Sequence, residues 1–228
     1  VAHELNQPLN AIRVGCEYFL KLLAREQQIS KEILERVSKE LVEQVERASS
    51  IINHLREFGR KSKVEELEWV DINTPILGVF TVLGQQLKLR QIKVQLELQE
   101  KLPPVMGVAN RLEQVFLNLV MNARDAIEEK QNLNSEQSFE PRLTIRSYQE
   151  KGNIVVTVAD TGVGLPEAVR DRIFEPFFTT KEVGRGTGLG LSISYGIVRD
   201  CGGNIEVDSE EGAGTIFKLT FPAATELT

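Results

Sequence analysis

Two glycine clusters on either side of an aromatic patch constrain this sequence more than any other feature. The first cluster is Asp160-Thr161-Gly162-Val163-Gly164, the second is Gly186-Thr187-Gly188-Leu189-Gly190, and Phe174-Glu175-Pro176-Phe177-Phe178 lies between them. Glycines at this density let the backbone approach a ligand closely and use its N–H groups as donors, which suits phosphates. The second cluster opens an apolar run over residues 189–198, so we expect a helix whose N-terminus faces an anion.

The usual nucleotide-binding fingerprints do not fit these clusters. No lysine follows the glycines as in a P-loop, and the spacing is not the G-x-G-x-x-G of a dinucleotide fold. Taken alone, residues 186–190 fit a glycine-rich surface loop equally well, so other features have to decide.

A carboxylate and two amides supply those features. Asp160 ends a strand-like run over residues 154–159, where it can accept hydrogen bonds from an exocyclic amine such as that of adenine, or cap a turn. Asn118 and Asn122 are four residues apart on a helix predicted over residues 111–130, so both point to one face. An amide oxygen facing a phosphate pocket can complete the shell of a Mg²⁺ that otherwise holds water and phosphate oxygens.

In this order the motifs resemble the core of a sensor histidine kinase, whose ATPase part shares a superfamily with gyrase, Hsp90 and MutL. Asn118-Leu119-Val120-Met121-Asn122-Ala123 resembles the N box, residues 173–178 the F box, and Gly212-Ala213-Gly214-Thr215 the last of three glycine boxes. The resemblance implies ATP and Mg²⁺ as cofactors, Asn122 as a Mg²⁺ ligand, Asp160 as the residue that recognises adenine, and a mobile lid from about Pro176 to Thr187.

The nucleotide-binding residues implied in this way are Asn118, Asn122, Asp160, Gly162, Gly164, Lys181, Gly186, Thr187, Gly188, Leu189, Gly190 and Thr215. Lys181 and Arg185 fall in the lid, and either they reach the phosphates or they are exposed loop charges.

The N-terminal residues Val1-Ala2-His3-Glu4-Leu5-Asn6-Gln7-Pro8-Leu9 resemble the H box of the same family, with His3 at the phosphorylated position. Attack by the imidazole needs an unprotonated Nε2, with the Nδ1 proton held or removed by a carboxylate, and the resemblance assigns this role to Glu4. Gln7 stands where many relatives carry Thr or Asn, which help to place a water that dephosphorylates the partner protein. Either Gln7 or the nearby Asn6 is a candidate for that task, so the implied catalytic residues are His3, Glu4 and Gln7.

Two amphipathic helices follow from the N-terminal pattern. Apolar residues recur at heptad-like spacing, first at Leu5, Leu9, Ile12, Cys16, Phe19 and Leu23, then, after a predicted N-cap at Ser30, at Ile33, Leu34, Val37, Leu41, Val45, Ala48, Ile52 and Leu55. A hairpin of this length cannot bury both stripes by itself. We expect a homodimeric four-helix bundle, with packing on the chain's own ATPase part as the alternative. Cys16 and Cys201 are predicted to be buried thiols.

The expected fold class is α+β, with the dimeric helical hairpin followed by a two-layer α/β sandwich that binds ATP. We place the hairpin at residues 1–62, a charged linker at 63–72 and the ATP-binding domain at 73–228. Within that domain we expect helices over 73–89, 111–130 and 189–198, strands over 92–98, 142–148, 154–159, 204–208 and 215–221, and a loop over 131–141.

The predicted function is an ATP-dependent protein-histidine kinase that phosphorylates His3 and passes the phosphoryl group to an aspartate on the receiver domain of a response regulator. One alternative is an ATP hydrolase of the same superfamily, which needs a catalytic carboxylate where this chain has Asn118. The other is a degenerate nucleotide-binding module that only dimerises and docks a partner.

Composition adds limits on partners and location. The formal net charge of −6 argues against nucleic acid as a partner. No apolar run is long enough to span a bilayer, so we expect a cytoplasmic fragment without membrane contact of its own. The sequence starts without Met just before His3, so we expect it to be part of a longer protein whose sensor domain, and any membrane anchor, lies outside this chain.

Overall fold

The structure, a computed structural model, describes residues 2–25, 30–59, 66–133, 139–181 and 188–224. The N-terminal helices belong to one compact unit, and residues 64–180 and 188–228 belong to another. None of the helices in the described ranges combines the length and the hydropathy needed to cross a bilayer.

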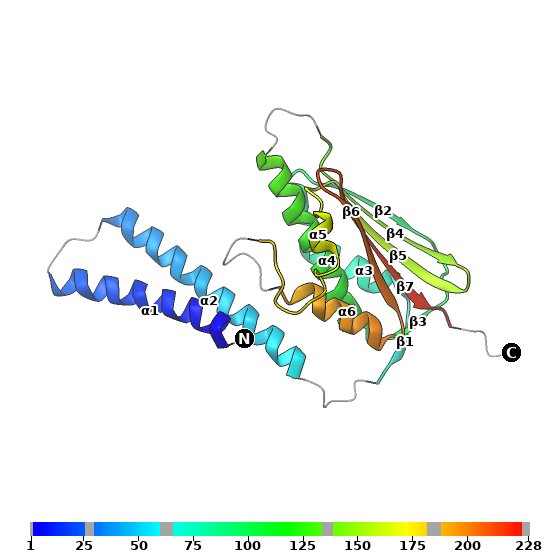
Figure 1. Ribbon diagram of the computed structural model, residues 1–228, viewed down its shortest axis with the longest axis horizontal. Coiled ribbons are helices and arrows are strands. Elements are labelled where there is room, and N and C mark those ends of the chain that lie inside the picture. Colours follow the sequence, from blue (N-terminus) through cyan, green and yellow to red (C-terminus); the bar gives the residue numbers. More distant parts are fainter. Residues whose placement is uncertain (1, 26–29, 60–65, 134–138, 182–187, 225–228) are drawn as a thin grey trace. The chain divides into compact units, whose positions relative to one another are not determined.

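The first unit is a pair of helices, α1 (Ala2–Ala24) and α2 (Lys31–Gly59), drawn in Figure 1. Ser30 caps α2 as predicted, because its Oγ accepts a hydrogen bond from the N–H of Ile33 at 3.4 Å. The helices approach closely at Gly15, where an added Cβ would lie 2.7 Å from a methyl carbon of Leu41. The helix α1 runs through Pro8 without interruption.

Packing within the hairpin uses only part of the apolar surface. Ile12 and Phe19 on α1 and Val37 and Leu41 on α2 are half-buried. A second stripe at heptad spacing stays exposed, and we call it the open seam. Its members are Leu9, Cys16, Leu20 and Leu23 on α1 and Leu34, Val45 and Ile52 on α2, with the leucines at positions 20 and 23 each 65% exposed.

The prediction that both cysteines are buried is therefore wrong for one of them. Cys201 is buried, whereas Cys16 is exposed. The reason is that Cys16 lies on the open seam, which the described residues of the helical hairpin leave uncovered.

The second unit contains a five-stranded sheet and the helices that pack on it. Its strands are β2 (Lys93–Leu98), β4 (Arg142–Glu150), β5 (Asn153–Asp160), β6 (Asn204–Glu210) and β7 (Gly214–Pro222), in the spatial order β2-β4-β5-β7-β6. The β2–β4 pair is parallel and the other pairs are antiparallel. A separate two-stranded ribbon pairs β1 (Glu68–Val70) with β3 (Val105–Gly107).

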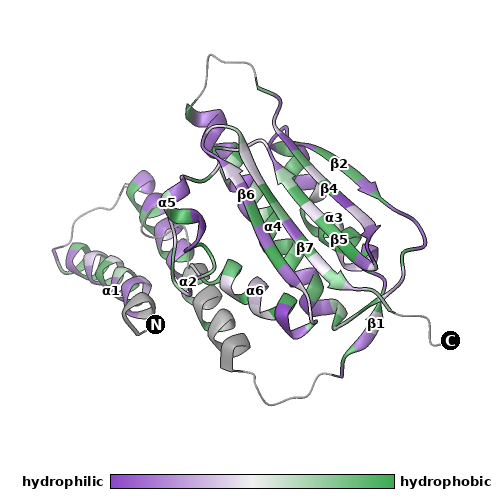
Figure 2. Cartoon of the chain, turned by 45° about the vertical axis from the view of Figure 1, so that its right-hand side comes forward, coloured by the Kyte–Doolittle hydropathy of each residue, from purple (hydrophilic) through white to green (hydrophobic). Residues whose placement is uncertain are grey.

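One face of this sheet is covered by α3 (Asn73–Leu89), α4 (Ala109–Leu133) and α6 (Gly190–Asp200), as Figure 1 shows, and α5 (Glu167–Arg170) is a short turn of helix. Side chains alternate along each strand, so Ile145, Val156, Val158, Phe217 and Leu219 point into the core and are at most 5% exposed. In Figure 2 hydrophilic and hydrophobic positions are mixed along the strands in the way that a half-covered sheet requires. The architecture is the predicted α+β fold with a two-layer sandwich.

The predicted elements match the observed ones with small shifts at their ends. The helix expected over 73–89 coincides with α3, and the one expected over 111–130 extends at both ends as α4, so the loop predicted from residue 131 begins later. The segment 63–72, which we expected to be a linker, contains β1, whose residues pair with β3.

Candidate functional site

The pairing of β5 with β7 places Asp160 directly opposite Thr215. The Oδ1 of Asp160 accepts a hydrogen bond from the N–H of Gly162 at 2.8 Å, and the backbone N–H of Thr215 donates to the same carboxyl group. Burial raises the pKa of Asp160 to about 6, and these two N–H groups, together with the charge of Lys130, act in the opposite direction. A carboxylate held in this way keeps free lone pairs for a ligand donor.

The glycines around Asp160 are required by close contacts. A Cβ at Gly162 would lie 2.6 Å from the Cβ of Ala126 on α4 and 2.8 Å from the Oδ1 of Asp160. Gly164 has φ +70°, and a Cβ there would collide with the carbonyl oxygen of Glu210. The turn after β5 therefore packs tightly against α4 and against the end of β6, with no room for side chains.

Asn118 joins α4 to the start of α6. Its Nδ2 donates to the carbonyl oxygen of Gly190 at 3.2 Å and to the Oγ of Ser194 at 3.3 Å. Asn122, one turn further along α4, is half-buried. Leu189, the residue that precedes α6, is 2% exposed and anchors the N-terminus of that helix in the core. The structure thus brings Asn118 to the N-terminus of α6, and Asn122 lies one turn further along the same helix.

The aromatic patch meets the second glycine cluster at one point. The N–H of Phe177 donates to the carbonyl oxygen of Gly188 at 2.9 Å, and both residues have positive φ, +67° and +64°. Gly186 and Thr187, together with the rest of residues 182–187 of the predicted lid, lie outside the described residues. Lys181 is described and half-buried.

The predicted phosphoacceptor residues lie on α1. His3 and Glu4 are part of this helix, but their side chains are outside what the structure describes. Gln7 is half-buried one turn later, and Pro8 is buried. Because proline has no N–H, the carbonyl of Glu4 receives no helical hydrogen bond from position 8.

Two residues that sequence reasoning did not single out also belong to the site. Lys130, in the last turn of α4, donates from Nζ to the carbonyl oxygens of Thr161 and Gly212. The buried Oγ of Ser209 accepts from the N–H of Leu165 at 2.8 Å and lies 2.9 Å from the Oγ1 of Thr215. The inward position of Ser209 in the alternation of β6 was a usable signal, whereas nothing in the sequence separates Lys130 from a solvated lysine.

The chemistry of the donor set limits which metal it could hold. Among the described residues no group of three or more His, Cys, Asp or Glu side chains is placed to bind a metal ion. A metal at this site would therefore take most of its ligands from phosphate and water. Mg²⁺ is commonly coordinated in this way.

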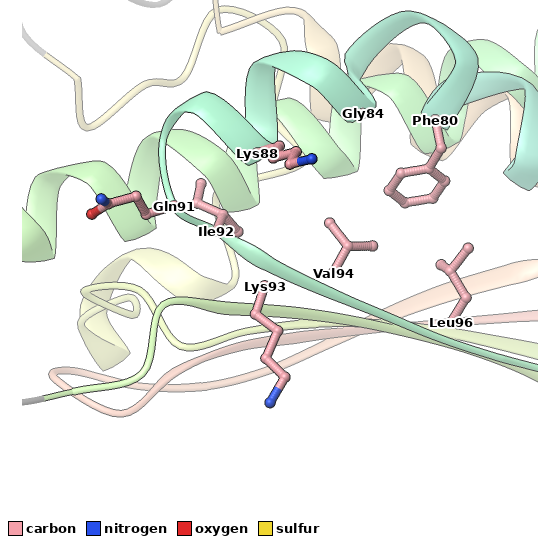
Figure 3. Close-up of a pocket in the computed structure, with 8 residues that line it drawn as sticks. All are labelled: Phe80, Gly84, Lys88, Gln91, Ile92, Lys93, Val94 and Leu96. Atoms are coloured by element: carbon pink, nitrogen blue, oxygen red, sulfur yellow. The ribbon is translucent and has the colours of Figure 1, made fainter.

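A hollow of about 480 Å³ lies elsewhere in the second unit, between α3 and the edge strand β2 (Figure 3). Its lining consists of Phe80, Gly84, Lys88, Gln91, Ile92, Lys93, Val94 and Leu96. None of these residues is among the predicted site residues.

A model of a known protein family matches each of the two units. Residues 1–63 match the model of the His Kinase A (phospho-acceptor) domain, and residues 107–225 match the model of the histidine kinase-, DNA gyrase B- and HSP90-like ATPase. Since these matches cover most of the chain, it belongs to the sensor histidine kinase family.

Individual relatives give the same result. The chain is 36% identical over 231 residues to the sensor kinase CckA of Brucella abortus and 36% identical over 227 residues to the two-component sensor PprA of Pseudomonas aeruginosa, covering 99% and 98% of this chain. It spans 24% of the length of each of these proteins. Among solved structures, the histidine kinase ThkA in complex with the response regulator protein TrrA matches with 25% identity and a TM-score of 0.73, over 100% of this chain and 61% of ThkA.

The collision at Gly164 leads to a stability prediction. Gly164→Ala forces the backbone at Glu210 to move, so we expect it to lower the free energy of unfolding of the second unit by several kcal/mol. The matched control is Gly152→Ala, where φ is +81° but nothing lies within 4 Å of the added carbon. Only the left-handed backbone opposes that change, at about 1 kcal/mol. Urea unfolding of both variants checks this, and equal losses would contradict the packing described here.

The buried carboxyl of Asp160 leads to a prediction on pH. Its pKa is higher in the folded state, about 6, than the ordinary value of 3.8, so the native protein binds more protons than the unfolded chain between these limits. Stability therefore falls as pH rises through this window, and at neutral pH the cost is at most about 3 kcal/mol, at 1.36 kcal/mol per pKa unit.

Asp160→Asn keeps the acceptor oxygen and removes the charge. We expect this variant to be more stable than the wild type at pH 7.5, with the advantage shrinking to nothing by pH 4. Thermal unfolding across this range measures the difference, with the exposed Asp208→Asn as the control expected to follow the wild type. A pH-independent offset for Asp160→Asn would show that the buried charge is not its cause.

Proposed function

We propose that this chain is the core of an ATP-dependent protein-histidine kinase that phosphorylates its own His3 and then passes the phosphoryl group to an aspartate of a response regulator. The observation that supports this most is the combination of motifs in one polypeptide. A helix with a phosphoacceptor motif at His3 is followed by a two-layer domain in which Thr215 and the first glycine cluster surround the carboxylate of Asp160.

The residues present fit ATP. The carboxylate of Asp160 accepts a hydrogen bond from the exocyclic amine of adenine, and the absence of a side chain at Gly162 and Gly164 lets the base approach the backbone. The N-terminus of α6, at Gly190, faces the phosphates with the N–H groups of its first turn. The proposal extends this set to Gly188, Leu189 and Thr215, and to Gly186, Thr187 and Lys181 of the lid.

The residues also fit Mg²⁺. When bound, Mg²⁺ neutralises charge on the phosphates during transfer. The neutral amide oxygen of Asn122 is a hard ligand of the kind that this ion takes alongside water and phosphate. Asn118 holds the start of α6 in place from the same side of α4.

Transfer to His3 needs one proton to be controlled. The Nε2 lone pair attacks the γ-phosphorus, a P–N bond forms, and the P–O bond to the leaving ADP breaks. Glu4 holds the Nδ1 proton and stabilises the positive imidazolium that develops. The carbonyl of Glu4, left without its helical donor because position 8 is proline, makes the turn below His3 easier to distort.

We assign to Gln7 a second activity, the dephosphorylation of the partner protein. Gln7 lies four positions after His3, and positions four apart share one face of a helix. An amide can orient a water for attack on an aspartyl phosphate, although glutamine reaches one methylene further than the asparagine found in many relatives.

The receiver domain of a response regulator is the proposed partner, because the similar kinase ThkA has been solved in complex with the response regulator TrrA. Upstream sensing is proposed to reside in a part of the protein outside this chain. A kinase core of this type works in the cytoplasm, where ATP is available.

Labelling identifies the acceptor. With γ-³²P-ATP and Mg²⁺ we expect the wild type to gain a label that is labile in acid and stable in alkali, and His3→Ala to gain none while its ATP affinity is unchanged. Label in His3→Ala would place the acceptor elsewhere. Release of free phosphate without labelling of the wild type would favour an ATP hydrolase, and ATP binding with neither product would favour a degenerate module.

We further propose that the open seam is covered by a second copy of the chain, which forms a four-helix bundle. An exposed apolar stripe on each of two neighbouring helices is the surface that such a bundle buries.

The seam can be tested with a pair of charge substitutions. Leu20→Glu places a charge on the seam and should turn the dimer into a monomer. Val14→Glu is the matched control, because Val14 is 59% exposed but lies about 120° around the helix from Leu20. Sedimentation equilibrium distinguishes the two outcomes, and loss of the dimer in both variants, or in neither, would contradict the seam.

A further inference from the structure

Lys130 connects two segments that are far apart in the sequence. From the last turn of α4 its Nζ donates to the carbonyl oxygen of Thr161 at 3.0 Å and to that of Gly212 at 2.8 Å. Thr161 follows Asp160 directly, and Gly212 lies in the tight turn between β6 and β7. We call residues 161–165 the first glycine segment and residues 211–213 the β6–β7 turn.

These two segments also contact each other directly. The N–H of Gly212 donates to the carbonyl oxygen of Val163 at 2.7 Å, and the N–H of Val163 donates to the carbonyl oxygen of Ala126 on α4 at 3.2 Å. The N–H of Leu165 is bound by the Oγ of Ser209 at the end of β6. The first glycine segment is thus held from α4 on one side and from the β6–β7 hairpin on the other.

The ammonium group of Lys130 makes three contacts with protein groups in this arrangement. Two of its three N–H donors are used on the carbonyls, and Nζ lies 4.8 Å from the centre of the Phe139 ring, within the range of a cation–π contact. The residue is half-buried. Its charge is therefore directed at protein groups and not at open solvent.

The position of Lys130 along α4 separates it from the predicted phosphate end of the site. Asn118, which contacts the start of α6, is twelve residues earlier, or about 18 Å along the helix axis. Asn122, Ala126 and Lys130 follow at intervals of one turn. Lys130 consequently belongs to the end of the site that holds Asp160.

We propose that Lys130 is a positioning residue of the nucleotide site, which fixes the first glycine segment against the β6–β7 turn and so sets the geometry in which Asp160 meets the adenine base. This inference rests on the proposed role of Asp160 in adenine recognition. Lys130 does not touch the nucleotide in this proposal, and its effect passes through the backbone at Thr161 and Gly212.

The test compares three variants of the full chain by calorimetric titration with ATP and with inorganic tripolyphosphate. Lys130→Met keeps the length of the side chain and removes the donors, and we expect its Kd for ATP to rise by about 10- to 100-fold, as for loss of hydrogen bonds from a charged donor. Lys130→Arg restores a charged donor and should recover most of the affinity. Lys88→Met removes a lysine from the last turn of α3 and should bind ATP like the wild type.

Tripolyphosphate distinguishes positioning from direct contact. Its Kd should be the same in the wild type and in Lys130→Met, because the phosphate end of the site is unchanged. A parallel loss for tripolyphosphate would overturn the proposal in favour of a phosphate-binding lysine. An unchanged Kd for ATP in a folded Lys130→Met protein would overturn it in favour of a purely structural side chain.

A double variant separates this inference from the proposed function. If Lys130 acts through the Asp160 segment, Lys130→Met should weaken ATP binding much less in an Asp160→Asn background than alone. If Asp160→Asn itself leaves the ATP affinity unchanged, the assignment of adenine recognition fails. If Asp160→Asn weakens ATP binding and the effects of the two substitutions simply add, only the role of Lys130 is wrong.

Discussion

The register between β5 and β7 is the constraint on which the rest of the site depends. These strands pair from Asn153 opposite Pro222 to Asp160 opposite Thr215, and this joins the first and last glycine boxes although more than fifty residues separate them. Because side chains alternate along a strand, a slip of one residue would turn Thr215 away from the core and replace it beside Asp160 with a neighbour. The buried side chains Val156, Val158, Phe217 and Leu219 prevent that slip, so the packing of the core fixes the residues that are proposed to bind the nucleotide.

The positions of most helices and strands could be predicted from the sequence. Individual side-chain contacts could not, for a physical reason. The alternation in β4, β5 and β7 and the helical period of α4 are strong enough to place these elements within a few residues. Period and propensity do not reveal which acceptors a flexible side chain reaches, so Lys130 has the same sequence signature as a solvated lysine. The exposure of Cys16 was missed for a related reason. The heptad pattern marks an apolar stripe but not which part of it the second helix covers.

Asp160 shows why a residue that is proposed to bind a ligand can lower the stability of the fold. A carboxyl group whose pKa is raised to about 6 by burial destabilises the ligand-free fold at neutral pH, and the uncharged side chain of asparagine would avoid that penalty while keeping an acceptor oxygen for the N–H of Gly162. The carboxylate does offer more acceptor capacity to a bound base than the amide, because both of its oxygens accept. The cost is offset locally by Gly162, Thr215 and Lys130, each of which favours the charged form.

The helix α4 connects the parts of the candidate site, because residues on its successive turns contact successive parts of it. Asn118 secures the start of α6, the carbonyl of Ala126 receives the N–H of Val163, and Lys130 binds both glycine-containing turns. These contacts are backbone-directed, so they fix the path of the chain and leave the ligand-facing groups free. A helix with a buried apolar face, formed by residues such as Phe116, Leu119 and Ile127, is stiff enough to keep the two ends of the site at a constant separation. The distance between the groups proposed to hold phosphate and adenine is therefore set by segments that are all fastened to this one helix.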